Sequence, residues 1–79
     1  IPELLPALAR ASKAAGRLDQ AGLADLVAEA AEGDGVGPRL LALVLEARRI
    51  GVDPEAALRA VVRSLEAASL NNQTQPDRL

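Results

Sequence analysis

The segment that most constrains the fold of this chain is PRLLALVLEARRIGVDPEAALRAVVRSL, from Pro38 to Leu65. Its apolar residues recur three and four positions apart on both sides of a short turn, a spacing typical of helices that bury one face. Gly51 stands where a helix commonly ends in a left-handed residue. Asp53 then offers a capping oxygen, and Pro54 suits the first position of the next helix. The segment therefore predicts two helices joined by a tight turn.

The composition extends this helical prediction to the whole chain. About half of the 79 residues are apolar, mostly Ala and Leu, and there is no Phe, Tyr or Trp. Ala and Leu are strong helix formers, and the few Val and Ile residues do not alternate with polar ones as they would in a strand. A chain of this size seldom gains more than about 3–5 kcal/mol from one core. We therefore predict an all-α antiparallel bundle of about four helices that associates as a dimer through its third and fourth helices.

The spacing of apolar residues and the positions of Gly, Pro and Asp predict where the other helices begin and end. The first helix is predicted from about Pro2 to Ala15, with Gly16 ending it. The second is predicted over 19–32, with Asp19 as its N-cap. A glycine-rich connection, GDGVG, occupies 33–37 before Pro38 opens the third helix. The domain is predicted to span 1–70, and the polar stretch 71–79 is predicted to be a flexible tail.

Several classes of function are disfavoured by what the chain lacks. There is no His or Cys, so the commonest general base and the commonest metal ligands are missing. A net charge of −2 and the lack of aromatic side chains do not suit a nucleic-acid binder. No apolar run is long enough to span a membrane, and we expect a cytoplasmic protein. Because the sequence begins at Ile1 rather than Met, we expect a larger gene product around it.

Two blocks of sequence resemble a known family. The segment 38–65 and the stretch LPALARASKAAGR at 5–17 resemble the MazG-type nucleoside triphosphate pyrophosphohydrolases, the all-α NTP pyrophosphatases. That family carries a helix reading roughly G-D-L-L-F-A-L-V-N-x-A-R, a turn G-V/I-D-P-E and a helix beginning A-L-R. The matching positions are Gly37, Leu40, Ala42, Leu43, Val44, Ala47 and Arg48, then Gly51, Val52, Asp53, Pro54, Glu55, Ala57, Leu58 and Arg59.

The resemblance implies Mg²⁺-dependent cleavage of NTPs to NMP and pyrophosphate, but most of the implied metal ligands are replaced. The family's E-E-x-x-E motif falls on Ala21, Gly22 and Asp25, and its E-x-x-D motif falls on Gly35 and Pro38. At the positions where the family usually has Asn or Lys, this sequence has Leu45, Val62 and Ser64. Carboxylates are the ligands that Mg²⁺ needs to bridge phosphates and activate water. Asp25 and Glu29 are therefore the metal ligands that we name, and no catalytic residue is assigned.

Each candidate group also has a simpler interpretation. Asp25, Glu29 and Glu32 either form a residual Mg²⁺ site or are the solvated face of an amphipathic helix, and the second interpretation is favoured. The loop GDGVG could present N–H groups to a phosphate, although a linker is favoured because no strand precedes it. Glu46 is expected to be a surface residue rather than a site residue. For Arg48, Arg59 and Arg63, a charged surface is favoured over phosphate contacts.

Two hypotheses of function follow. In the first, the chain is a MazG-like nucleotide pyrophosphohydrolase homologue with weak or no catalysis. In the second, it is a non-catalytic helical module for oligomerisation or regulation. The resemblance favours the first, and the missing carboxylates favour the second. We expect little or no Mg²⁺-dependent hydrolysis by this chain.

Overall fold

The computed structural model describes residues 6–73, and these residues form four α-helices and no strand. The helices are α1 (Ala7–Gln20), α2 (Ala24–Ala30), α3 (Val36–Arg49) and α4 (Pro54–Gln73). The prediction of an all-α chain with about four helices is confirmed. Helix α4 continues three residues beyond the predicted domain end at 70. The remaining part of the predicted tail, 74–79, and the predicted helix start at Pro2 lie outside the described residues.

The boundary between the first two helices differs from the prediction. Helix α1 runs through Gly16 and ends at Gln20, and Gly22 with φ of 76° makes the turn. The N–H of Leu23 donates to the carbonyl oxygen of Leu18 at 2.8 Å, and that of Gly22 donates to Asp19 at 3.1 Å. This pattern is a Schellman motif, which satisfies the last carbonyls of a helix. The prediction that Asp19 caps the second helix is therefore wrong.

The glycine-rich connection has the predicted length but lies two residues earlier, at 31–35 instead of 33–37. Helix α2 ends at Ala30 rather than at 32, and α3 begins at Val36 rather than at Pro38. Gly35 is the residue before α3 and has an extended backbone. Pro38 is the third residue of α3, where its missing N–H costs nothing because the first four N–H groups of a helix have no partner within it.

The turn between α3 and α4 confirms the sequence prediction. Gly51 has φ of +78°, and the N–H of Val52 donates to the carbonyl oxygen of Ala47 at 2.8 Å, so α3 also ends in a Schellman motif. The Asp53 Oδ1 atom accepts hydrogen bonds from the N–H of Glu55 at 3.0 Å and of Ala56 at 3.4 Å. Asp53 is thus the N-cap, and Pro54 is the first residue of α4.

Replacing Gly51 by Ala is expected to destabilise the chain by about 1–2 kcal/mol, because an L residue is strained at positive φ. The matched control is Gly37→Ala, since Gly37 lies in α3 and a Cβ there would meet nothing within 4 Å. That control should leave stability unchanged or raise it by up to about 1 kcal/mol. Urea unfolding of the two variants measures the difference. Equal effects would show that the left-handed turn contributes little.

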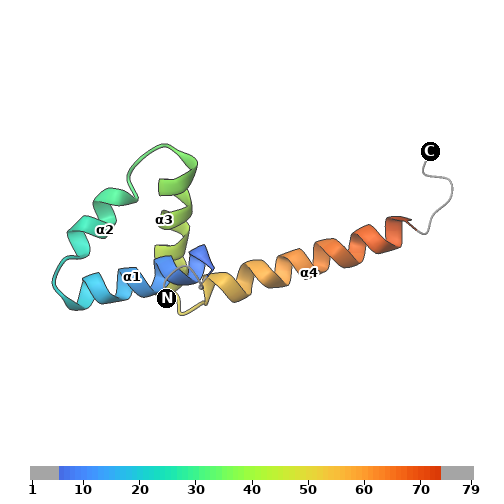
Figure 1. Ribbon diagram of the computed structural model, residues 1–79, viewed down its shortest axis with the longest axis horizontal. Coiled ribbons are helices and arrows are strands. Elements are labelled where there is room, and N and C mark those ends of the chain that lie inside the picture. Colours follow the sequence, from blue (N-terminus) through green and yellow to red (C-terminus); the bar gives the residue numbers. More distant parts are fainter. Residues whose placement is uncertain (1–5, 74–79) are drawn as a thin grey trace.

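Helices α1, α2 and α3 pack around one small core, while α4 leaves them (Figure 1). The buried residues of the described chain are Ala15 on α1, Val27 on α2 and Val44 on α3. The first turns of α4 lie near α1 and α3, and the rest of the helix extends away. The molecule measures 57 × 27 × 25 Å, with a radius of gyration of 16.8 Å. A compact domain of this length would have about 11.6 Å.

The extended shape leaves much apolar surface in water. The accessible surface is 6318 Å², whereas a compact monomer of 8.2 kDa exposes about 4,500 Å². Every described side chain of α4 beyond Glu55 is exposed, including five Leu and Val residues. Within the described chain, no helix is both long and apolar enough to cross a membrane. In a single copy of the chain, three helices therefore form the core, and most of the fourth helix is exposed to solvent.

Candidate functional site

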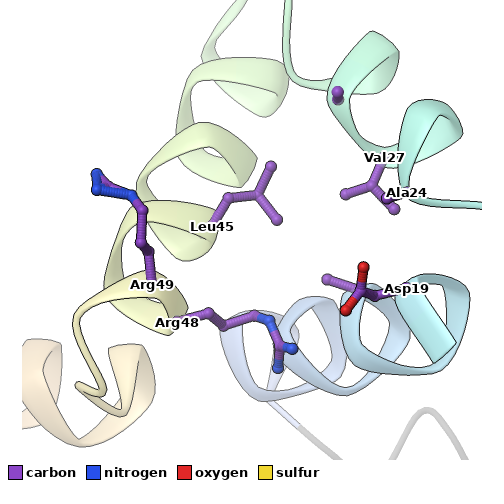
Figure 2. Close-up of a pocket in the computed structure, with 8 residues that line it drawn as sticks. Asp19, Ala24, Val27, Leu45, Arg48 and Arg49 are labelled. Carbon is purple, nitrogen blue, oxygen red and sulfur yellow. The ribbon is translucent and has the colours of Figure 1, made fainter.

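Helices α1, α2 and α3 meet around an open pocket of about 300 Å³ (Figure 2). Its apolar lining comes from all three helices and includes the buried residues Ala15 and Val27. Acidic and basic side chains also border the pocket. The residues that line the pocket are Ala15, Asp19, Ala24, Val27, Ala28, Leu45, Arg48 and Arg49. Small ligands are usually held in such concave sites, where an apolar floor is combined with a few polar groups.

Arg48 reaches from α3 across to α1. Its Nη1 atom donates to the backbone carbonyl oxygen of Ser12 at 3.1 Å. Its guanidinium lies against Gly16, where an added Cβ would be 3.3 Å from both Nη atoms. A larger residue at position 16 would crowd this contact. Gly16 lies within α1 and leaves room for the Arg48 side chain, whereas the sequence pattern had predicted that Gly16 ends the helix.

Asp19 borders the same pocket from the last turn of α1. Figure 2 shows its carboxylate on the pocket side of α1, with the Arg48 guanidinium nearby, whereas the Arg49 side chain points away from Asp19. No ion pair joins any two residues in the part of the chain that the structure describes. The pocket is thus bordered by two cationic side chains, Arg48 and Arg49, and by one anionic side chain, Asp19, and no ion pair joins them.

The two predicted metal ligands, Asp25 and Glu29, lie together on α2 but away from the pocket. Both side chains are exposed. Each is two residues from the buried Val27, which places it about 160° around the helix from the core side. Among residues 6–73, no group of three or more acidic side chains is close enough to hold a metal ion. Metal binding by this pair remains a prediction.

The other candidate residues do not gather into a site. Glu46, Arg59 and Arg63 are all exposed, Glu46 on α3 and the two arginines on α4. In the glycine-rich connection, a Cβ on Gly33 would lie 2.9 Å from Cγ of Pro38, so the connection packs closely on the start of α3. Arg48 is the predicted candidate that the fold places at the pocket.

Two helices also carry apolar side chains that nothing in the described chain covers. The outer α3 face consists of Val36, Leu40, Leu43 and Ile50, which are 47–71% exposed and lie within an arc of about 80°. The α4 face consists of Leu58, Val61, Val62 and Leu65, which are 41–67% exposed and lie within about 100°. Contiguous apolar surface of this kind commonly marks an interaction site.

Comparison with known proteins gives one similarity. The chain is 50% identical over 60 residues to an uncharacterized 26.1 kDa protein encoded in the region 3′ of blaB in Streptomyces cacaoi. The match covers 76% of this chain and 24% of that protein, so the chain spans about a quarter of its relative's length. No family model matches the sequence. No solved structure matches it either.

Proposed function

We propose that this chain is a MazG-like helical module whose role is association, with weak or no nucleotide pyrophosphohydrolase activity of its own. The partner is a second copy, and the contact is formed by the outer α3 face and the α4 face. The observation that carries the proposal is the exposure of eight Leu, Ile and Val side chains on these two faces, in a chain whose described core has three buried residues. Burying such surface is the main favourable term in protein association.

The arrangement of these side chains supports a specific contact between helices rather than a nonspecific apolar surface. On each helix the four side chains line one face, as in helices that pack along their length. Charged residues stand outside the α4 face, at Glu55, Arg59, Arg63 and Glu66. A twofold dimer would use both faces of each copy and would leave these charges at the rim.

The family part of the proposal depends on the residues of the turn. Gly51, Asp53 and Pro54 belong to the G-x-D-P-E resemblance, and each has a specific role at the α3–α4 junction. This support is limited to the scaffold, because Gly, Asp and Pro serve the same purposes in unrelated helical turns. It agrees with a module that keeps the family's helical framework.

The acidic residues support weak or no catalysis. Mg²⁺ bound at a phosphate-transfer site needs several oxygen ligands that converge on one point. Asp25 and Glu29 are exposed on α2, and no third acidic group joins them among the described residues. A nucleotide remains the ligand that the resemblance implies, and Mg²⁺ the implied cofactor.

We expect little or no Mg²⁺-stimulated release of pyrophosphate when this chain is incubated with a panel of NTPs. The reason is the replacement of the acidic motifs at Ala21, Gly22, Gly35 and Pro38. The assay is run with Mg²⁺ and with EDTA, and Asp25→Asn serves as the matched variant. Robust turnover that Mg²⁺ supports and Asp25→Asn abolishes would show that the chain is an active hydrolase.

A further inference from the structure

We propose that the pocket between α1, α2 and α3 binds a small zwitterion, namely a free aliphatic α-amino acid. Its ammonium group would donate to Asp19, its carboxylate would accept from Arg48, and its side chain would lie on the apolar floor. This proposal concerns a site that is separate from the outer α3 and α4 faces. The proposed binding of an amino acid can therefore be tested independently of the proposed association.

The two charged groups of the pocket are the first argument. Asp19 on α1 and Arg48 on α3 both border the pocket, and they form no ion pair. Arg48 is held in place by the hydrogen bond from its Nη1 atom to Ser12, and the guanidinium has further N–H groups that can donate to a carboxylate. A ligand that carries both charges would complement Arg48 and Asp19, which border the pocket with opposite charges.

The position of Asp19 is the second argument. It lies in the last turn of α1, where the helix dipole favours cations and disfavours a carboxylate. Within the described chain, no cationic side chain forms an ion pair with this carboxylate. An ammonium group bound there would interact favourably both with Asp19 and with the negative end of α1.

The apolar floor of the pocket indicates which side chain the bound amino acid would carry. Ala15, Ala24, Val27 and Leu45 offer a small aliphatic surface, without aromatic or hydroxyl groups. The volume of about 300 Å³ is at the lower end of the range for ligand pockets, which suits a ligand of a few carbon atoms. Leucine, isoleucine and valine combine such a side chain with both charges.

The experiment titrates the ¹⁵N-labelled chain with L-leucine and follows amide chemical shifts. We expect saturable shifts at Ala24, Val27 and Leu45, with a dissociation constant of about 1 mM. Two analogues test the charges in the unaltered protein: 4-methylpentanoate lacks the ammonium, and 3-methylbutylamine lacks the carboxylate. Each should bind at least about tenfold more weakly than leucine, and glycine should also bind more weakly because it cannot contact the floor.

The variant Asp19→Asn keeps the shape of the side chain and removes its charge, and it should weaken leucine binding about tenfold. The control is Asp34→Asn, an exposed acid in the connection before α3, which should leave the affinity unchanged. Three results would overturn the proposal: no saturation with leucine, equal binding of 4-methylpentanoate, or the same shifts with inorganic phosphate. Either of the last two would indicate a simple anion site. The analogue series decides the question even if Asp19→Asn perturbs the fold.

Discussion

A glutamate in place of Leu65 is expected to weaken self-association of this chain by at least about a hundredfold. Leu65 is 67% exposed and belongs to the α4 face, so the single chain tolerates a polar residue there. In a twofold dimer the substitution would place a carboxylate in the apolar contact of both copies, and an unpaired buried charge is costly. A hundredfold change in dissociation constant corresponds to about 2.7 kcal/mol. Sedimentation velocity over a range of protein concentrations measures the shift.

The matched control is Ala67→Glu. It introduces the same side chain and charge at an exposed position of the same helix, about 160° around α4 from Leu65. Self-association should be unchanged in this variant. If Ala67→Glu weakens association as much as Leu65→Glu does, the added charge rather than the α4 face is responsible.

Replacing Val44 by Ala is expected to lower the free energy of unfolding by about 2 kcal/mol. Val44 is 2% exposed and is the most deeply buried residue of the described chain. The substitution removes two carbon atoms from the core, which loses about 0.8 kcal/mol for each and leaves a cavity as well. This loss is large for a small domain, whose core seldom contributes more than about 3–5 kcal/mol. A fall of roughly 10 °C in the melting temperature should accompany it.

Leu26→Ala is the control for this prediction. It removes one carbon atom more than Val44→Ala does, but Leu26 is 54% exposed on α2 and belongs to neither proposed contact face. We expect it to cost less than about 1 kcal/mol. Both variants must be compared at one protein concentration, because the stability of an associating chain depends on concentration. A larger loss for Leu26→Ala would show that the core has been placed wrongly.

The sequence predicted the α3–α4 junction best, because local chemistry determines it. Gly51 and Asp53 act through backbone geometry and one capping oxygen, which depend little on the rest of the fold. The end of α1 was predicted wrongly because Gly16 was interpreted as the residue that ends the helix, whereas the helix continues to Gln20 and turns at Gly22. In the structure the Arg48 side chain lies against Gly16 within α1, and Gly22 takes the left-handed conformation of the turn.

The pocket could not be predicted from local pattern. Asp19 was interpreted as an N-cap, because an acid before an apolar stretch commonly has that role. Its place beside Arg48 depends on how α1 and α3 cross, which the sequence spacing does not specify. One signal was available: with the turn at Gly22, Asp19 becomes an acid in a helix's last turn, which is an unfavourable position. The apolar spacing in 38–65 predicted helices with an apolar face, and on α3 the structure leaves part of the apolar surface exposed.

The most direct test of the central claim is sedimentation equilibrium of the unaltered chain at micromolar concentrations. The claim is that the outer α3 face and the α4 face are covered by a second copy. It predicts a mass of twice the 8.2 kDa chain, falling toward the monomer on dilution. A single species of monomer mass throughout the micromolar range would contradict it.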